Sequence, residues 1–303
     1  METMDLQMSS TIRVGIIGGS GFDRSDILSN RVEHEIFDTP YGQPSDNLVS
    51  GTINGVQCVL CFRHGRQHSF NPTKLNYRAN LWALKQLGVD LVLATTAVGS
   101  LSEDFKRGTL VVFGIDFVYS IIHFHQNFDY NLDNFIDMTK HRPNTFYDHE
   151  PGHLEGVMHM SMHPPYDREL RQLLIQSCAE TPDVTYKEKS TVVVIEGPNF
   201  STYAENKVFI SWGCTTIGMT QTPETILAKE LGLPYAALGI VTDDICWKED
   251  GIVEPNEVIT IFKATFPKAV KILKRTIQKI GEKDWKEILE TIRNRTEEAI
   301  MKH

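Results

Sequence analysis

The sequence predicts an α/β fold built as a single domain, and two observations support this prediction. Short β-branched or apolar runs alternate with longer amphipathic stretches along the chain, as strands alternate with helices in α/β proteins. No internal repeat, low-complexity tract or linker interrupts the 303 residues. We expect residues 1–10 to be a disordered polar tail, 11–303 to form the domain, and 119–134 to be an extended surface loop.

Composition and charge limit the partners that this chain is expected to have. Hydrophobic residues make up 41% and charged residues 23% of the sequence, which is typical of a soluble globular protein. A net charge of −9 disfavours nucleic acid, and no run reaches the roughly 18 apolar residues of a membrane helix. The N-terminus lacks an apolar signal core. We therefore expect a small-molecule ligand, no nucleic-acid or membrane partner, and a cytoplasmic protein, with the nucleus as the alternative compartment.

The five cysteines favour a reducing compartment. Cys58 and Cys61 form a C-x-x-C pair, but the surrounding VQCVLCF reads as a strand, which places neighbouring side chains on opposite faces. No second C-x-x-C completes a zinc site. We expect buried free thiols and no metal.

Two apolar runs near the N-terminus predict strands that end in polar turns. Ile12–Ile17 leads into a glycine turn that contains Ser20, and Val56–Phe62 leads into Arg63 and His64. A glycine turn lets backbone amides approach an anion, although a tight turn with positive φ explains it equally well. An arginine fork can bind two phosphate oxygens. The alternative for Arg63 and His64 is a solvated charged loop.

The next elements continue the alternation of strands and helices. Asn71 is the expected N-cap of an amphipathic packing helix, with Pro72 at its first position. The run Asp90–Ala97 predicts a strand that is buried on both faces, and its end carries Thr96 and Ala97. A hydroxyl and a backbone amide at such a position suit a phosphate or ribose oxygen. Thr109–Phe117 is a further predicted strand.

The second half of the chain is expected to contribute residues that bind the ligand. Thr191–Ile195 predicts a buried strand, and Phe200 and Ser201 follow it in a loop. Thr222 and Pro223 indicate a helix start, as N-cap and first helical residue. The same alternation predicts a helix over Asp167–Ala179, and Tyr235–Val241 predicts a strand that leads to Asp243.

The C-terminal part predicts two helices that pack against the domain. The helical pattern after Pro255 should be kinked or interrupted at Pro267. The final helix is expected over Lys283–Met301.

Ligands of open α/β sheets bind at the carboxyl ends of strands, so a flat base could stack on Phe200 and bind Asp243 there. Ordinary loop residues are the alternative explanation.

Seven motifs make this picture specific. They read VGIIGGSGF, FRHGRQHSFNPTKLNYRANLWALK, LVLATTAVGSL, FIDMTKHRPNTFYD, IEGPNFST, MTQTPETILAKE and TDDICWKE. In this order, and over nearly the whole chain, they resemble the trimeric purine nucleoside phosphorylases, above all the branch that acts on 5′-methylthioadenosine. The resemblance implies a homotrimer with a central twisted mixed β-sheet flanked by helices. It also implies a pentosyltransferase without metal or other cofactor that cleaves S-methyl-5′-thioadenosine with inorganic phosphate, releasing adenine and 5-methylthioribose 1-phosphate for purine salvage.

The resemblance further implies the residues of the site. Phosphate would be bound by Ser20, Arg63, His64, Thr96, Ala97 and Thr220. Met219 would lie under the ribose, and Phe200 and Ser201 would line the base pocket. Asp243 would be the catalytic acid at purine N7, where a proton neutralises the charge that develops on the leaving base. His159 would reach the 5′ end of the nucleoside from the neighbouring subunit.

Several positions depart from the family pattern. Ile245 stands where the methylthioadenosine branch has a second acid, and Asp244 lies one residue early, on the other face of an extended chain. Asn256 and Thr260 are polar where apolar residues would face the 5′-substituent, and the loop 119–134 is an insertion. The alternatives are therefore a related phosphorylase for 6-oxopurine or 5′-hydroxyl nucleosides such as inosine or adenosine, a catalytically poor nucleoside-binding protein, and a nucleoside hydrolase.

Overall fold

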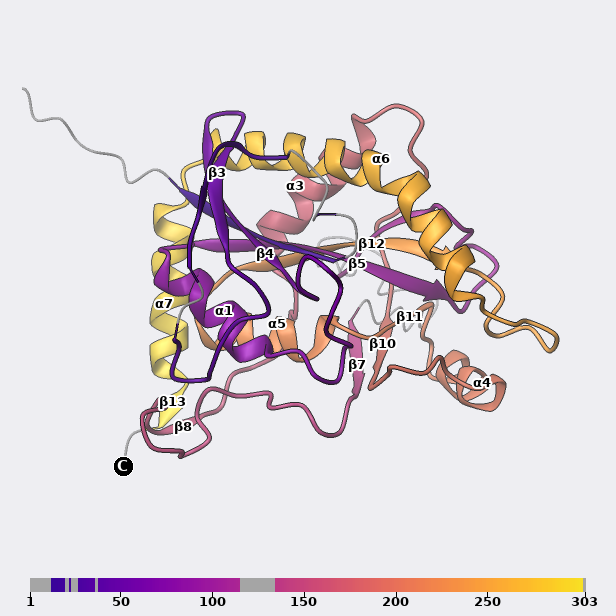
Figure 1. Ribbon diagram of the computed structural model, residues 1–303, viewed down its shortest axis with the longest axis horizontal. Helices are drawn as coiled ribbons and strands as arrows, with labels where there is room; N and C mark the ends of the chain where they lie inside the picture. The colour runs from indigo at the N-terminus through magenta and orange to yellow at the C-terminus, as the bar shows by residue number, and fades with distance from the viewer. Residues whose placement is uncertain (1–11, 20–21, 23–26, 36–37, 115–133, 302–303) are drawn as a thin grey trace, which may run out of the picture.

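The computed structural model describes residues 12–19, 22, 27–35, 38–114 and 134–301. These residues form one α/β domain in which helices pack on both faces of a large mixed β-sheet (Figure 1). The N-terminal tail, Ser20 and nearly all of the loop 119–134 lie outside the described residues. Within the described part, no helix is long and apolar enough to cross a membrane.

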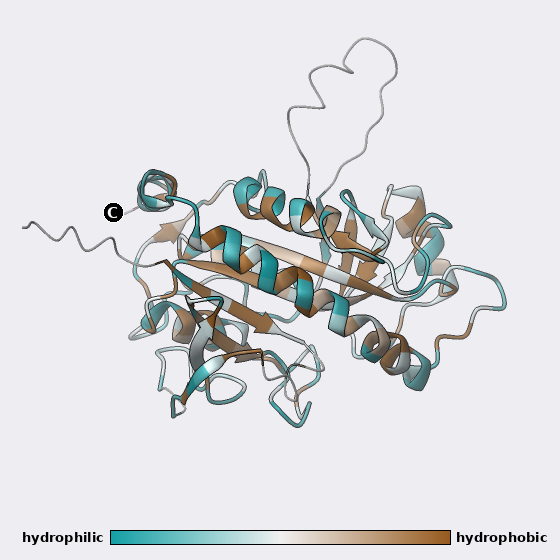
Figure 2. Ribbon diagram, turned by 90° about the horizontal axis from the view of Figure 1, so that it is seen from above, coloured by the Kyte–Doolittle hydropathy of each residue, from teal (hydrophilic) through white to brown (hydrophobic). Residues whose placement is uncertain are grey.

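The described strands build a sheet of eleven strands. Along its main path the order is β2 (Ser29–Glu33), β3 (Val49–Ile53), β4 (Val56–Phe62), β1 (Arg13–Gly18), β5 (Leu91–Ser100), β11 (Thr216–Gly218), β10 (Val192–Ile195) and β7 (Phe135–Met138). A branch adds β12 (Tyr235–Asp243) beside β5, then β6 (Leu110–Val112) and β9 (Tyr186–Lys187). The central strands are hydrophobic over most of their length (Figure 2), whereas β2 is polar and exposed.

Strand β5 is the centre of the sheet. It pairs in parallel with β1 and with β12, and its last two residues pair antiparallel with β11. Strand β4 runs parallel to β1 on the other side. Because β1, β4, β5 and β12 run in the same direction, their carboxyl ends lie at one edge of the fold, where α/β proteins bind ligands.

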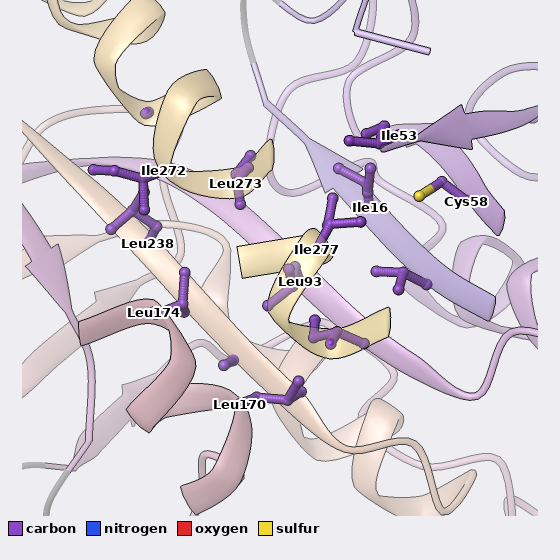
Figure 3. Close-up of a cluster of buried hydrophobic side chains, with 14 of the residues drawn as sticks. Ile16, Ile53, Cys58, Leu93, Leu170, Leu174, Leu238, Ile272, Leu273 and Ile277 are labelled. Atoms are coloured by element: carbon purple, nitrogen blue, oxygen red, sulfur yellow. The ribbon is translucent and has the colours of Figure 1, made fainter. Parts of the chain in front are cut away.

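Helices α3 (Arg168–Ala179) and α6 (Pro255–Gly281) cover one face of the sheet. Figure 3 shows the contact, in which leucines of α3 and the apolar stripe of α6 pack on β1, β5 and β12. Its labelled members include Leu170, Leu174, Ile272, Leu273 and Ile277, which are all fully buried. Each such side chain stabilises the fold by roughly 1.5–3 kcal/mol.

Helices α1 (Tyr77–Gln86) and α5 (Gln221–Glu230) cover the other face. Leu81 and Leu84 of α1 and Leu227 of α5 are buried there against β1 and β5. Helix α4 (Tyr203–Ser211) is largely exposed to solvent, and its buried residues are Asn206 and Phe209. Helix α7 (Lys286–Glu298) follows α6 at the C-terminus.

Most predicted strands and the helix over Asp167–Ala179 are confirmed. Strand β4 has the predicted bounds, and Asp167 caps α3 by accepting a hydrogen bond from the amide of Leu170 at 2.9 Å. The predicted strand over Thr109–Phe117 is only β6 within the described residues. All five cysteines are free and buried, as expected.

Of the two helix starts predicted at proline, the one at Asn71 was wrong, and the one at Thr222 lacks only its capping hydrogen bond. The carboxamide of Asn71 accepts from the amide of Lys74 in a local turn, and α1 begins at Tyr77, capped by Asn76. Thr222 is extended, with φ −114° and ψ 140°, so the regular turns of α5 begin at Pro223 as predicted, but the buried Thr222 hydroxyl has no partner among the described residues and gives no side-chain cap. At Asn71 a local turn competes successfully with the helix-start signal.

The C-terminal prediction needs two corrections, and one helix earlier in the chain was missed. Helix α6 is not interrupted at Pro267, although it bends along its length in Figure 1. The last helix ends at Glu298, and Ile300–Met301 forms a short strand, β13, paired with β8 (Val157–Met158). Helix α4 was missed, even though Thr202 and Glu205 form a capping box of the T-x-x-E pattern.

Candidate active site

A cavity of about 530 Å³ lies where the carboxyl ends of β1, β4, β5 and β12 meet β11 and the loop after β10. This size suits a small molecule such as a nucleoside with an anion. The cavity brings together most of the predicted site residues: Arg63, His64, Thr96, Ala97, Phe200, Ser201, Met219, Thr220 and Asp243. Their roles in binding stay predictions that the experiments below test.

Arg63, at the end of β4, is buried and already paired. Its Nε and Nη2 atoms donate to the two carboxylate oxygens of Glu224 on α5, both at 2.7 Å. Its Nη1 donates to the carbonyl of Thr95 at 2.8 Å. The planar fork therefore faces Glu224 and not the cavity. Arg63 reaches the cavity wall beside Gly19, where a Cβ would lie 3.4 Å from Nη1.

His64 is nearly buried in the same wall. Its Nδ1 lies 2.8 Å from the carbonyl oxygen of Phe70, and its ring stacks on that of His68 with centroids 4.4 Å apart. Because a carbonyl only accepts, Nδ1 carries the proton and donates. Burial lowers the pKa of His64 to about 3, with the nearby charge of Arg63 as a further cause. The ring is therefore neutral near pH 7.

Two hydroxyls complete the polar end of the cavity. The Oγ1 atoms of Thr96 on β5 and Thr220 before α5 lie 3.1 Å apart and share a hydrogen bond. Ala97 follows Thr96 on the same strand and is exposed to the cavity. Short hydroxyls and backbone amides at the end of a central strand suit the oxygens of an anion or a ribose.

Met219 lines the cavity and packs closely against Gly197. Gly197 has a left-handed φ of 68°, and a Cβ there would be 2.7 Å from the Met219 sulfur. The buried Arg142 donates to the carbonyls of Met219 and Thr222, at 2.6 and 2.9 Å, and to the carboxylate of Glu196 at 3.2 Å. Arg142 thus ties the loop after β10 to the loop after β11.

Two exposed phenylalanine rings line the cavity, Phe70 and Phe200. Phe200 is 47% exposed and lines the cavity. The hydroxyl of Ser201 donates to the carboxamide oxygen of Asn206 at 2.6 Å, and the Asn206 nitrogen donates to the carbonyl of Cys246 at 2.7 Å. This chain of contacts fixes the Phe200 loop against the segment that follows Asp243.

Asp243 ends β12 and is almost fully buried. The pairing of β12 with β5 shifts register just before it, so that Asp243 lies opposite Gly99. A Cβ on Gly99 would stand 3.3 Å from Oδ2 of Asp243, so the glycine gives the carboxylate its room. The other oxygen, Oδ1, accepts from the amide of Ile245 at 3.0 Å. Among the described residues that line the cavity, Asp243 is the one acid.

The remaining predicted residues lie elsewhere. Asp244 points away from the cavity and pairs with Arg107 at 2.8 Å, so it does not replace the missing second acid. Ile245 and Asn256 do not line the cavity, and Asn256 is exposed. Thr260 is exposed as well, and its hydroxyl donates to the Asn256 carbonyl within α6.

The wall beside α6 is apolar, against the expectation from Asn256 and Thr260. Val253, Val258 and Phe262 face the cavity from this segment. The helical period explains the difference, because Val258 and Phe262 are four residues apart on one side of α6, while Asn256 and Thr260 share another side. The sequence contained this signal, because the four-residue spacing of each pair already places Val258 with Phe262 and Asn256 with Thr260 on separate sides of a helix.

His159 lies in a second hollow, of about 890 Å³, which is larger but lies away from the strand ends. This hollow is lined by the segment that follows β8, by the start of α3 and by α7. The first cavity remains the candidate site, because the acid, the cation and the hydroxyls converge there. Ser20 lies outside the described residues.

Sequence reasoning missed Glu224 and Arg142 as parts of this site. Their signal was weak, because a charged side chain on an ordinary amphipathic stretch reads as solvent-exposed. Both are buried here, at 2% and 8% exposure. The described residues contain no group of three or more His, Cys, Asp or Glu side chains placed to hold a metal ion.

Comparisons with known proteins agree with this geometry. A family model described as the phosphorylase superfamily matches residues 13–279. S-methyl-5′-thioadenosine phosphorylase from Caenorhabditis briggsae is 46% identical over 281 residues, which covers 92% of this chain and 91% of that protein. The protein of the same name from Xenopus tropicalis is 42% identical over 292 residues, which covers 96% of this chain and 96% of that protein.

Solved structures show the same fold. Methylthioadenosine phosphorylase from Schistosoma mansoni in complex with adenine has a TM-score of 0.85 at 36% identity, covering 96% of this chain and 99% of that chain. A mutant of adenosine/methylthioadenosine phosphorylase from the same organism, in complex with methylthioadenosine, has a TM-score of 0.84 at 35% identity, with the same coverage. The single domain with a mixed central sheet is therefore the nucleoside phosphorylase fold.

Proposed function

The chain belongs to the phosphorylase superfamily, and we propose that it cleaves S-methyl-5′-thioadenosine to adenine and 5-methylthioribose 1-phosphate. The observation that carries the choice of substrate is the apolar wall of Val253, Val258 and Phe262. A thioether is best bound by apolar side chains, because a polar partner there would be left without a hydrogen bond. Relatives that span nearly the whole chain carry this activity in their names.

The proposed reaction breaks the bond between C1′ of the sugar and N9 of adenine and forms a C1′–O bond to phosphate. Positive charge develops on the sugar and negative charge on the base. Hydrogen phosphate loses one proton when it becomes the sugar ester, and adenine gains one. We assign to Asp243 the task of holding that proton at N7, since it is the acid in the cavity wall.

We further propose inorganic phosphate as co-substrate, bound at the end of the cavity that holds Arg63, His64, Thr96, Ala97 and Thr220. A homotrimer is proposed on the resemblance to the trimeric phosphorylases, with His159 of each copy completing a neighbour's site. A cytoplasmic location and a reaction without metal or organic cofactor belong to the same proposal. The five buried free thiols support a reducing compartment.

Adenosine is the second candidate substrate. The solved structure with methylthioadenosine is of an enzyme named for both nucleosides, at 35% identity. A 5′-hydroxyl would need a polar partner, and the nearest described candidates on α6, Asn256 and Thr260, are turned to solvent. We therefore place adenosine behind methylthioadenosine.

The test is an assay of base release by the purified protein with and without phosphate. It compares methylthioadenosine, adenosine and inosine side by side. We expect phosphate-dependent release of adenine, fastest from methylthioadenosine. Preference for inosine would contradict the assignment of the base, and release without phosphate would identify a hydrolase. Binding without any turnover would favour the nucleoside-binding alternative.

A further inference from the structure

One buried asparagine fixes the direction of the hydrogen bonds on the base side of the cavity. Asn206, on α4, is 0% exposed, and its two side-chain partners, Ser201 and Cys246, both line the cavity. One atom of its carboxamide lies 2.7 Å from the carbonyl oxygen of Cys246. Because a carbonyl only accepts, this atom is the nitrogen, Nδ2. The atom that lies 2.6 Å from the hydroxyl of Ser201 is therefore the oxygen, Oδ1.

The hydroxyl of Ser201 is thereby left as an acceptor. Its one proton is donated to Oδ1 of Asn206, which leaves two lone pairs on the hydroxyl oxygen. If the proton turned toward a ligand, Oδ1 would stay buried without any donor among the described residues, which costs free energy. Ser201 therefore presents to the cavity an oxygen that accepts hydrogen bonds and does not donate them.

Ser201 belongs to the same side of the cavity as the acid. Its partner Asn206 binds the carbonyl of Cys246, and the Cys246 sulfur lies next to the Asp243 carboxylate. A Cβ on Gly99 would be 3.7 Å from that sulfur and 3.3 Å from Oδ2 of Asp243. On a purine, N7 and the substituent at C6 share one edge. A base whose N7 faces Asp243 therefore turns its C6 substituent toward the neighbouring wall.

The chemistry of the base decides which group an acceptor can bind there. The only N–H groups of a 9-substituted adenine are the two of its 6-amino group, so an acceptor that binds this base directly must bind the amino group. A 6-oxopurine presents a carbonyl at the same position, and two acceptors leave each other without a hydrogen bond. An acceptor at this place binds a 6-aminopurine and rejects a 6-oxopurine.

We propose that Asn206 is a positioning residue that makes the site selective for 6-aminopurines, because it holds the proton of Ser201 and so presents an acceptor to the 6-amino group. Asn206 itself does not line the cavity and acts through Ser201. The proposal rests on the proposed function in so far as the substrate is a purine nucleoside with N7 at Asp243. It goes beyond that function in naming the residues that select the base.

A ratio of two substrates tests the proposal. Methylthioadenosine is compared with its 6-oxo counterpart, 5′-methylthioinosine, in the base-release assay at saturating phosphate. The quantity is the ratio of their kcat/KM values within each variant, so that a loss of folded protein cancels. For the wild type we expect a ratio of at least about 100 in favour of methylthioadenosine.

Two substitutions of Asn206 separate its hydrogen bonds. Asn206→Leu has a similar size but no acceptor, so the Ser201 hydroxyl is free to turn and the ratio should fall about tenfold. Asn206→Asp keeps an oxygen opposite Ser201, whether or not the new carboxyl is ionised, and should hold the ratio within about threefold of the wild type. When ionised, it has lost the donor to Cys246, as the leucine has. A fall of the ratio in Asn206→Asp equal to that in Asn206→Leu would overturn the proposal.

Ser201→Ala tests the acceptor directly and keeps the test valid if Asn206→Leu does not fold. It should lower kcat/KM for methylthioadenosine about tenfold and leave that for 5′-methylthioinosine unchanged. Asn80→Leu is the matched control. Asn80 is also buried on a helix, α1, and also binds a serine, Ser45, but neither residue lines the cavity. The control should keep the ratio of the wild type.

The outcomes distinguish this inference from the proposed function. An equal loss for both nucleosides in Asn206→Leu, with the ratio unchanged, would show a merely structural role and overturn the inference. An unchanged ratio in Ser201→Ala would overturn it as well. Phosphate-dependent release of adenine by the wild type would leave the function standing in either case. A wild type that prefers 5′-methylthioinosine would contradict both.

Discussion

At the scale of single residues, Asp243 owes its position to three neighbours. The register shift in β12, the missing side chain of Gly99 and the amide of Ile245 together aim one carboxylate at the base side of the cavity. The departure at Ile245 leaves no second acid in the described wall. In the proposed mechanism, Asp243 would then serve both for leaving-group activation and for recognition of the base.

Asp243→Asn should lower kcat for methylthioadenosine by roughly 10²–10⁴, the usual contribution of a general acid, with the unfolding temperature unchanged. An amide cannot supply the proton that the leaving base requires, although it still fills the same space. Steady-state kinetics and thermal unfolding measure the two quantities. Asp244→Asn is the control, because that acid lies one residue away and binds Arg107 outside the cavity. Equal kcat values for the wild type and Asp243→Asn on every purine nucleoside would remove Asp243 from the mechanism.

Glu224→Gln should destabilise the protein by about 3–5 kcal/mol, because it leaves the buried charge of Arg63 uncompensated. Both side chains are 2% exposed, so water cannot take over the role of the carboxylate. Chemical unfolding measures the loss. The control is Lys106→Ala, which removes an exposed pair with Glu103 and should cost about 0–1 kcal/mol. Similar losses in both variants would show that the pair with Arg63 is not the buried ion pair described above.

At the scale of elements, the segment between β12 and α6 forms part of the cavity wall. One side chain, Arg107, contacts both ends of this segment. Arg107 donates to Asp244 at the end of β12 and also to Glu257 in the first turn of α6. Between these two contacts the chain contributes Cys246 and Val253 to the cavity. Arg107 therefore positions the wall without touching the ligand.

Arg107→Met should raise KM for methylthioadenosine roughly two- to fivefold and change kcat less, as expected for the loss of partly exposed ion pairs. The physical reason is a looser wall of Val253 and Val258. Arg275→Met is the matched control, because Arg275 lies near the other end of α6 and pairs with Glu180 at 3.6 Å. Should both variants shift KM equally, the effect would belong to the stability of α6 and not to the wall.

At the scale of the whole molecule, His159 lines a second hollow that shares no lining residue with the candidate site. A role for His159 in the site therefore requires a second copy. Light scattering should report a trimer, and a monomer would leave His159 without that role.

Subunit mixing tests the same point. His159→Ala should raise KM for the nucleoside, and Asp243→Asn should lose turnover. Trimers that contain both variants should regain activity above either parent, because some sites then combine an intact Asp243 with an intact His159 from a neighbour. Mixed trimers no more active than their parents would place His159 outside the site.

The sequence by itself determined the fold class, the main strands and the polar residues at their ends. Strand β4 and helix α3 could be predicted almost to the residue, because a buried β-branched run and an N-cap aspartate are local signals. The resemblance added roles for Arg63, His64 and Asp243. These residues do meet in one cavity, since parallel strands bring their carboxyl ends to one edge.

Only the tertiary structure decided how those residues are paired and which way they face. Glu224 accepts hydrogen bonds from the guanidinium group of Arg63. The carbonyl of Phe70 accepts from Nδ1 of His64, and Arg107 binds Asp244 outside the cavity. The partners of these three contacts are 161, 6 and 137 positions apart in the chain. Capping signals and side-chain periods act over a few residues, whereas a buried charge finds its partner wherever packing places one.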